Sequence, residues 1–190
     1  MAPPIVDVVD LRKGFETGLV LRGVSFALSK GETLVVMGGS GSGKTVLLRL
    51  IAGLIRPDGG RIRIFGESIE RLAEEDLLPI RRRMGYVFQG AALFDSLSVY
   101  ENVAYPLSEH TDLDADAIRG RVVHFLSLVG LESDVLPLLP SELSGGMRKR
   151  VGIARALIGE PEMLLFDEPT AGLDPTNARL VAELIAQLHM

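Results

Sequence analysis

The amino-acid sequence predicts an α/β fold, and three stretches of the chain support this prediction. The apolar, β-branched run Thr33–Met37 leads into a glycine-rich loop at residues 38–45. Directly after this loop, the apolar stretch Val46–Ile51 is typical of a buried helix. A second apolar run, Met163–Phe166, ends in two carboxylates. Strands that carry polar groups at their carboxyl ends commonly form the ligand site of an α/β sheet.

The composition narrows the class of protein. With 190 residues, of which 47% are hydrophobic, the chain is long enough for one substantial core and a subdomain. Its net charge of −5 argues against a general nucleic-acid surface. The absence of cysteine excludes disulfides, thiolate metal sites and cysteine nucleophiles, and it is consistent with a reducing cytoplasm.

The sequence also bears on membrane attachment. The N-terminus, Met1–Pro4, lacks the charged and apolar regions of a signal peptide. No apolar stretch approaches the roughly 18 residues that a membrane span needs. If the protein works at a membrane, we therefore expect another chain to hold it there.

The glycine-rich loop reads Gly-Gly-Ser-Gly-Ser-Gly-Lys-Thr over residues 38–45. Between a strand and a helix, this pattern predicts a phosphate-binding P-loop, in which backbone N–H groups and the helix dipole surround an anion. Lys44 is expected to reach the outer phosphates, and Thr45 to place its hydroxyl on Mg²⁺. The alternative is a flexible Gly/Ser linker, but a linker would not join a strand to an apolar helix.

Shorter runs around the loop predict three further strands, at residues 5–11, 24–28 and 61–66. A turn at residues 13–18 is expected between the first two. The helix after the loop is expected to end near Ile55, because Pro57 cannot continue it.

An arginine run, Arg81–Arg83, precedes the short apolar run Met84–Phe88. We interpret the arginines as a solvated helix end, with a binding patch as the alternative. The apolar run predicts a buried strand that ends at Gln89. A glutamine at a strand tip, in a chain with a P-loop, is a candidate ligand for a metal ion or a water molecule.

The segment from Gly90 to Gly159 is helical in character. One predicted helix starts at Asp114 and ends at Gly130. Its apolar residues follow helical spacing: Ile118, Val122, Phe125, Leu126 and Val129. A second helix, at 148–158, follows Ser144-Gly145-Gly146, which predicts either another phosphate-binding helix start or an ordinary serine N-cap.

The apolar run at residues 163–166 predicts a buried strand that delivers Asp167 and Glu168 to a ligand site. This is the Walker B arrangement. Asp167 is expected to hold Mg²⁺, and Glu168 to polarise the attacking water. The alternative is a strand that simply becomes polar as it reaches the surface.

The last helix is expected to begin at Asp174 as its N-cap and Pro175 as its first residue. Its expected core stripe consists of Leu180, Val181, Leu184, Ile185 and Leu188. The three histidines lack metal-ligand spacing, and we interpret all of them as structural or solvated: His110, His124 and His189.

Taken together, these motifs resemble the ATP-binding-cassette (ABC) ATPase family over essentially the whole chain. The Leu143-Ser144-Gly145-Gly146 stretch carries much of the resemblance, because other P-loop enzymes lack it. The resemblance implies a homodimer that sandwiches ATP, with Ser144, Gly145 and Gly146 of one protomer on the ATP of the other. It also implies that Phe15 stacks on adenine, that Gln89 contacts Mg²⁺ and links the site to a membrane partner, and that Asp174 communicates across the dimer.

The residue roles and the domain organisation follow from this resemblance. The expected catalytic residues are Glu168, Gln89 and Lys44, and the expected metal ligands are Thr45, Gln89 and Asp167. The expected ATP-binding residues are Phe15, Gly38, Gly39, Ser40, Gly41, Ser42, Gly43, Lys44, Thr45 and Val46. The resemblance implies an α/β P-loop NTPase fold, with a RecA-like core, an antiparallel β-subdomain and a helical subdomain. We expect one domain over 1–190, with the core at 1–89 and 160–190 and the helical subdomain at 90–159.

A narrower resemblance is to the ATPases of Mla-type phospholipid transporters, which work with a permease and an Mce-domain lipid-binding protein. It rests on residues 89–94, 101–107 and 109–111, and on Met147, where most ABC proteins have glutamine. Ala91 departs from the glycine that this resemblance predicts. The implied function is an ATPase that is peripheral on the cytoplasmic side of the inner membrane and binds ATP and Mg²⁺ but no nucleic acid.

The family also has a switch histidine after a further strand, and this sequence stops at Met190 before that strand. His189 is too close to Glu168 in sequence to be that residue. We therefore expect a domain that is incomplete at its C-terminus, binds ATP and hydrolyses it poorly.

Two other functions remain open at this stage. An ABC importer for another solute would share every ATP-site residue. A soluble, non-transport ABC ATPase is the second alternative, although the chain has no repeated cassette and no heptad insertion. A P-loop kinase would not explain residues 143–146.

Overall fold

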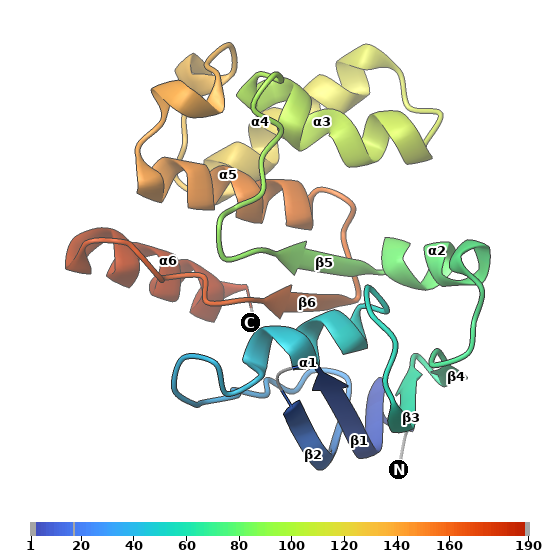
Figure 1. Cartoon of the computed structure of the whole chain (residues 1–190). Coiled ribbons are helices and arrows are strands. Elements are labelled where there is room, and N and C mark those ends of the chain that lie inside the picture. Colours follow the sequence, from blue (N-terminus) through green and yellow to red (C-terminus); the bar gives the residue numbers. More distant parts are fainter. Residues whose placement is uncertain (1–2, 17, 189–190) are drawn as a thin grey trace. The chain divides into compact units, whose positions relative to one another are not determined.

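The computed structural model describes residues 3–16 and 18–188. The chain divides into two compact units, residues 1–82 and 83–190, and each is described by itself (Figure 1). His189, one of the three histidines predicted to be structural or solvated, lies outside the described residues. Within the described ranges, no helix combines the length and apolarity that a membrane crossing requires.

The first unit contains an antiparallel four-stranded sheet in the order β2-β1-β3-β4. Its strands are β1 (Val6–Phe15), β2 (Gly18–Leu28), β3 (Gly59–Ile64) and β4 (Glu67–Ser68). Alternating residues of β1 and β3 are buried, including Val6, Val8, Ile62 and Ile64. The hairpin is tighter than the predicted turn at 13–18, because Phe15 pairs directly with Gly18. The structure therefore confirms the expected antiparallel subdomain.

Two helices complete the first unit: α1 (Lys44–Ile51) and α2 (Glu74–Arg82). The first helix ends earlier than Ile55, because Gly53 adopts a left-handed φ of 67°. Arg81 of α2 donates hydrogen bonds to the carbonyl oxygens of Ala52 (3.1 Å) and Gly53 (2.7 Å) at this helix end. The interpretation of the arginine run as solvated is therefore wrong for Arg81, whose guanidinium satisfies carbonyls that a helix end leaves open.

The predicted strand at residues 33–37 is not formed among the described residues. This segment has no regular secondary structure, and its apolar side chains are exposed, with Met37 at 88%. A strand requires hydrogen bonds from a neighbouring strand. None of the described pairings of the first unit's sheet includes residues 33–37. The apolar run alone therefore predicted the wrong local structure here.

The second unit places two parallel strands, β5 (Met84–Val87) and β6 (Met163–Phe166), side by side. The segment between them forms α3 (Val99–His110), α4 (Ala115–Leu128) and α5 (Gly145–Leu157). Two short 3₁₀ turns, Ser133–Val135 and Pro140–Glu142, lie between α4 and α5. The last helix, α6 (Pro175–Gln187), follows β6. Parallel strands need a long crossover connection, which these helices supply (Figure 1).

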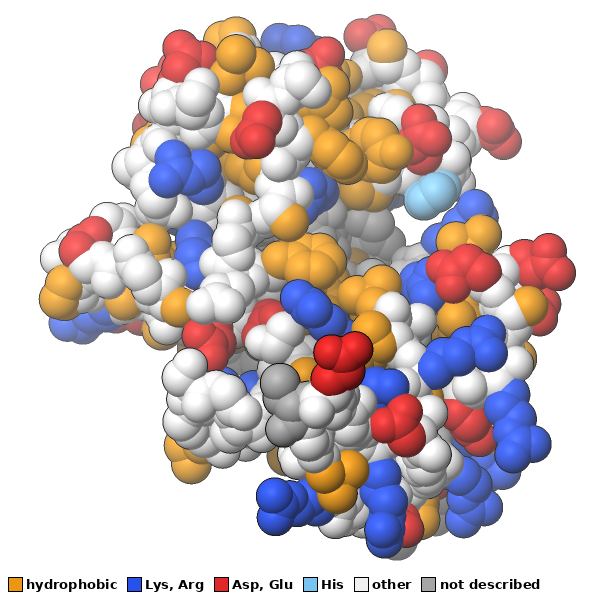
Figure 2. Space-filling view, viewed as in Figure 1, with side chains coloured by type: hydrophobic (Ala, Val, Ile, Leu, Met, Phe, Trp, Pro, Cys, Tyr) orange, Lys and Arg blue, Asp and Glu red, His pale blue; other side chains and the backbone are white. Residues whose placement is uncertain are grey.

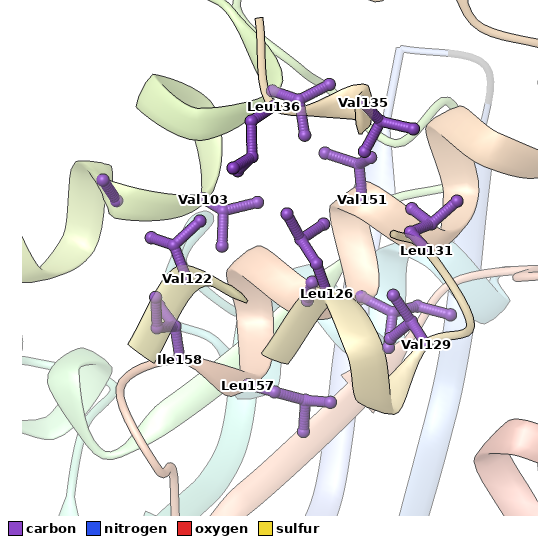
Figure 3. Packing of buried hydrophobic residues seen from close by; sticks show 14 of the residues in the cluster. Val103, Val122, Leu126, Val129, Leu131, Val135, Leu136, Val151, Leu157 and Ile158 are labelled. Carbon is purple, nitrogen blue, oxygen red and sulfur yellow. The ribbon is translucent and has the colours of Figure 1, made fainter. Parts of the chain in front are cut away.

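The core of the second unit lies among α3, α4 and α5 (Figure 3). Leu126 of α4 packs there with Val103 of α3 and with Val151 of α5, and all three side chains are essentially inaccessible to solvent. Burying an aliphatic side chain of this size contributes about 1.5–3 kcal/mol. The predicted apolar face of α4 is thus confirmed at its buried positions Ile118, Val122 and Leu126.

Two predicted helix starts are confirmed, whereas α5 begins at Gly145, three residues before the predicted Arg148. Asp114 accepts a hydrogen bond from the backbone N–H of Ala117 at 2.8 Å, and Asp174 caps α6 with Pro175 as its first residue. In α6, Val181 and Leu184 are buried, but Leu180 is 48% exposed. The prediction for Leu180 was therefore wrong, because 3.6 residues per turn place it about a quarter turn away from the buried positions 181 and 184.

Asn102 of α3 is fully buried and ties down the loop that precedes this helix. Its side-chain amide donates to the carbonyl oxygens of Phe94 (3.1 Å), Leu97 (2.9 Å) and Ser98 (3.0 Å). Its side-chain oxygen accepts from the N–H of Phe94 at 2.8 Å. One buried side chain therefore satisfies several backbone groups of residues 94–98.

We expect Asn102→Ala to lower the free energy of unfolding by about 2–4 kcal/mol, because buried backbone groups lose their partners. Urea denaturation followed by circular dichroism measures this change. Ser108→Ala on the same helix is the control, since the Ser108 side chain donates only one bond, to the carbonyl of Ala104. Equal stability of the two variants would contradict the assignment.

Candidate functional site

The P-loop in the first unit is shaped by two glycines with left-handed backbone. Gly41 has φ of 77°, and Gly43, the residue before α1, has φ of 97°. A side chain at Gly43 would also stand 2.8 Å from Cγ1 of Val20. Only glycine fits this position without strain, so the loop conformation follows directly from the sequence.

Lys44 begins α1 and turns back over the loop. Its Nζ donates to the carbonyl oxygens of Gly38 (2.9 Å) and Gly39 (3.0 Å). The N–H of Ser42 donates to the carbonyl of Gly39 at 3.3 Å, which closes the loop into a turn. The helix start and the ammonium group together give this end of α1 a positive potential, suited to a phosphate.

Phe15, the predicted adenine-stacking residue, lies at the end of β1 and is 48% exposed. The Nζ of Lys13 stands 5.4 Å from the centre of its ring. Lys13 in turn pairs with Asp58 at 2.7 Å, and this bond is the main reason that the pKa of Asp58 lies below its ordinary value. The ammonium of Lys13, itself paired with Asp58, therefore lies over the Phe15 ring.

In the second unit, Asp167 follows directly on β6 and is 4% exposed. Its backbone N–H donates to the carbonyl of Val87 at 2.9 Å, which extends the pairing of the two strands by one residue. The hydroxyl of Tyr86 donates to Oδ2 of Asp167 at 3.4 Å. A buried carboxylate that both strands hold in place can act as a strong acceptor for a cation.

Glu168 and Gln89 meet at the carboxyl ends of these strands. The side-chain amide of Gln89 donates to Oε2 of Glu168 at 3.2 Å. Glu168 itself has a left-handed φ of 46°, which costs a residue other than glycine about 1–2 kcal/mol. Backbone strain of this kind concentrates at functional sites. Two of the predicted catalytic residues are thus brought together.

Lys149 is a residue that the sequence analysis missed. It is 6% exposed, and its Nζ donates to the backbone carbonyl of Glu168 at 3.2 Å. Burial lowers the pKa of Lys149, and the charge of Glu168 opposes this shift. The sequence contains an indication that Lys149 is buried, because it lies at helical spacing between the buried residues Gly146 and Ile153. A lysine within an apolar stripe indicates a specific partner.

Ser144 is the N-cap of α5, and its hydroxyl accepts from the N–H of Met147 at 3.2 Å. The structure shows the serine N-cap, and this cap is compatible with a phosphate-binding helix start, because it leaves the helix end open to a ligand. The next turn is tightly packed: a side chain at Gly146 would stand 2.5 Å from Oδ1 of Asn177. Asn177 also donates to Oδ2 of Asp174 at 2.6 Å. It thus joins the Ser-Gly-Gly helix start to the loop at Asp174.

We expect Asp174 to make the stability of the protein depend on acid pH. The hydrogen bond from the Asn177 side chain is the main reason that the pKa of Asp174 is lowered. Its stabilising effect is therefore present above the unfolded-state pKa and is lost as the pH falls through the folded-state pKa. Asp174→Asn keeps a good capping residue but cannot titrate. The difference in thermal midpoint between wild type and variant should shrink from about pH 7 to about pH 3.

The control for this pH series is Asp95→Asn, at an exposed position in a loop. Its curve should run parallel to that of the wild type. If the Asp174→Asn curve also ran parallel across the acid range, the capping carboxylate would not be the source of the pH dependence.

Ala91, where the resemblance predicts glycine, has φ of 63°, and Ala92 has φ of 48°. The glycine that the resemblance predicts would thus suit the left-handed backbone at Ala91. Arg155 donates to the carbonyl of Ala91 at 2.8 Å and lies 5.8 Å from the ring of Phe94. Burial lowers the pKa of this guanidinium. These contacts hold the alanine-containing turn in place.

An apolar surface lies beside this turn in the second unit. Phe94 and Tyr105 are 44% and 42% exposed, and their ring centres are 5.0 Å apart. Figure 2 shows hydrophobic side chains gathered over the helices of this unit. Exposed aromatic pairs of this kind are common at protein interfaces.

Among the described residues, no three His, Asp or Glu side chains gather into a metal-binding cluster. His110 and His124 are exposed, which agrees with their interpretation as solvated. Of the predicted ligands, Thr45 in the first unit carries a hydroxyl oxygen, and Gln89 and Asp167 in the second unit carry amide and carboxylate oxygens. Oxygen donors of this type suit Mg²⁺, which commonly completes its coordination with substrate phosphates and water.

Comparisons with known proteins agree with these motifs. A family model for the ABC transporter matches residues 21–171. The chain is 42% identical over 192 residues to the intermembrane phospholipid transport system ATP-binding protein MlaF of Escherichia coli (strain K12), covering 100% of this chain and 71% of that protein. It is 41% identical over 184 residues to the probable ribonucleotide transport ATP-binding protein mkl of Mycobacterium tuberculosis (strain ATCC 25618 / H37Rv), covering 97% of this chain and 51% of that protein.

The fold is also that of a solved ATP-binding cassette. The dimeric structure of a post-hydrolysis state of MJ0796, bound to ADP and Pi, matches with a TM-score of 0.90 and 32% sequence identity. The match covers 97% of this chain and 82% of that one. The expected P-loop NTPase fold of the ABC type is therefore confirmed. By its matched family model, its relatives and its fold, the chain belongs to the ABC transporter family of ATP-binding domains.

Proposed function

We propose that the chain is the ATP-hydrolysing subunit of an ABC transporter that moves phospholipids between membranes of the cell envelope. The observation that supports the ATPase assignment is the hydrogen bond between Gln89 and Glu168. Glu168 directly follows the buried Asp167 in the sequence. The phospholipid assignment is supported by the similarity to MlaF over the full length of the chain.

Each predicted residue has a role in this mechanism. The P-loop amides and Lys44 bind the phosphates, and Phe15 stacks on the adenine ring. Glu168 accepts the proton of the attacking water as a general base, while the amide of Gln89 orients its carboxylate. The side chain is held in a fixed position before the reaction, which avoids the cost of reorganising it.

Thr45, Gln89 and Asp167 would hold Mg²⁺ in this mechanism. Their side chains supply the oxygen ligands that Mg²⁺ prefers. The carboxylate of Asp167 is buried, so a bound cation would compensate for its lost contact with solvent. When bound, Mg²⁺ neutralises charge that develops on the phosphate oxygens. The protein residues supply the positioning.

We propose that two copies of the chain act together. Ser144, Gly145 and Gly146 would contact the ATP bound to the P-loop of the other protomer, and Asp174 would communicate between the two sites. The open N-terminus of α5 supports this proposal, because its backbone N–H groups and dipole favour a phosphate. The related cassette MJ0796 is a dimer.

The proposed membrane partner is a permease, with an Mce-domain lipid-binding protein as a further partner. The exposed ring pair of Phe94 and Tyr105, on the proposed helical subdomain at 90–159, supports a permease contact. The subunit would then be peripheral on the cytoplasmic face of the inner membrane. ATP binding would close the dimer and move the permease, and hydrolysis would reopen it.

Transport of another solute is the second candidate, and the similarity to mkl, named for ribonucleotide transport, favours it. Co-purification separates the two. A tagged chain carrying Glu168→Gln is purified from detergent-solubilised membranes, with Lys44→Ala as a matched variant, and mass spectrometry identifies the proteins and lipids that remain bound. A permease with an Mce-domain protein and phospholipid is the expected result. A permease with a polar-solute binding protein would overturn the lipid assignment, and ribosomes or DNA would overturn transport.

A further inference from the structure

Lys149 contacts the backbone of the proposed catalytic glutamate from the interior of the second unit. Its Nζ donates to the carbonyl oxygen of Glu168 at 3.2 Å, and its side chain is 6% exposed. The same carbonyl accepts the N–H of Ala171 at 3.0 Å. Two donors from different elements thus converge on a single carbonyl oxygen.

This carbonyl belongs to a residue whose backbone conformation needs support from its surroundings. Glu168 has a left-handed φ of 46°, a conformation that L-residues other than glycine rarely adopt. Such a backbone persists only where surrounding contacts over-determine it. The ammonium of Lys149 and the N–H of Ala171 fix the carbonyl of Glu168, and the amide of Gln89 reaches its carboxylate at 3.2 Å.

The burial of Lys149 also needs an explanation. A lysine is almost never buried unless it is paired, because desolvation of an ammonium is costly. A methionine would fill the same space in α5 without that cost. Packing alone therefore does not explain the buried ammonium, whereas its hydrogen bond to the carbonyl oxygen of Glu168 does.

We propose that Lys149 is a positioning residue, which fixes the backbone of Glu168 and thereby sets the direction of its carboxylate. This inference rests on the proposed role of Glu168 as the general base. It also connects two parts of the machinery, because α5 begins at the Ser144 cap and carries Lys149 one turn further on. A displacement of this helix start would be transmitted to the glutamate of the same protomer.

Hydrogen–deuterium exchange, read by mass spectrometry on peptides covering residues 167–173, tests the anchor without requiring turnover. Lys149→Met removes the charge and keeps the volume, and we expect exchange in this segment to rise about tenfold or more. Lys149→Arg keeps a cationic donor and should restore most of the protection. Lys30→Met, at an exposed turn of the first unit, is the matched control and should match the wild type.

Steady-state ATP hydrolysis provides the second readout. Lys149→Met should lower kcat about tenfold or more with little change in KM, because it displaces the base without touching the nucleotide. Unchanged exchange at residues 167–173 would overturn the anchor, and increased exchange with unchanged kcat would overturn the positioning role.

A simple packing role predicts a thermal midpoint that falls in Lys149→Met and is not rescued by arginine. If Glu168→Gln also left kcat unchanged, the proposed function would fail, while the exchange data would still decide whether Lys149 is the anchor.

Discussion

Replacing Glu168 with glutamine is expected to lower ATP turnover by about 100-fold or more while leaving the affinity for ATP nearly unchanged. Glutamine has almost the same shape as glutamate, so the contact of this side chain with Gln89 and the backbone contact with Lys149 are retained. What is lost is the ability to accept a proton from the attacking water. The effect therefore falls on kcat and spares binding.

The same variant should also report on the dimer. If hydrolysis reopens the dimer, a chain that binds ATP without cleaving it accumulates in the closed state. Size-exclusion chromatography with Mg-ATP should then show Glu168→Gln as a dimer under conditions where the wild type is mainly monomeric. Turnover of radiolabelled ATP and binding of a fluorescent ATP analogue complete the comparison.

Glu162→Gln is a matched control for this experiment. Glu162 lies next to the start of β6, is half-exposed and pairs with Arg83 at 2.6 Å. Losing such a surface pair costs about 0–1 kcal/mol of stability. The substitution alters none of the proposed catalytic residues. Turnover in Glu168→Gln within twofold of this control would remove Glu168 from the catalytic role.

The helix starts were predictable because capping is a local interaction. Asp114, Ser144 and Asp174 each accept bonds from backbone N–H groups two or three residues further along, so the sequence pattern contains both partners. The P-loop was predictable for a similar reason. Its left-handed glycines and the lysine that folds back on their carbonyls lie within one short segment.

Features that depend on distant partners were harder to predict. The run at residues 33–37 has the composition of a strand, but strand formation requires a neighbouring strand that the run itself does not specify. Arg81 belongs to a run that predicts a solvated helix end, yet it caps α1, which lies about thirty positions earlier in the chain. Neither outcome can be derived from the few residues on each side.

The candidate site shows the same division. The roles proposed for Gln89 and Glu168 follow from their motifs, and the hydrogen bond between them joins residues 79 positions apart. The contribution of Asn177 follows from no motif, because its bond to Asp174 is local but its approach to Gly146 depends on how α5 and α6 pack. Motifs therefore identify candidate ligand-binding residues, while the approach of Asn177 to Gly146 emerges only from tertiary packing.

Lys44→Ala is expected to weaken ATP binding by about 10- to 100-fold, because a charge-assisted hydrogen bond contributes about 1.5–3 kcal/mol. The ammonium stands at the carbonyls of Gly38 and Gly39, within the loop that would surround the phosphates. Binding of nucleotide would exchange these carbonyl contacts for phosphate oxygens. Titration with a fluorescent ATP analogue in the presence of Mg²⁺ measures the change, with Lys30→Ala as the control of equal charge.

Thermal shift provides an independent measure that needs no hydrolysis. A ligand at 100 times its Kd stabilises the folded chain by about 2.7 kcal/mol, and a 10- to 100-fold weaker site reduces this to about 0.4–1.4 kcal/mol at the same concentration. The variant also loses two loop contacts, so its midpoint without ATP must be subtracted first. If the ATP-dependent shift of Lys44→Ala then equalled that of Lys30→Ala, Lys44 would serve only to hold the loop, and the positive charge at this end of α1 would come from the helix alone.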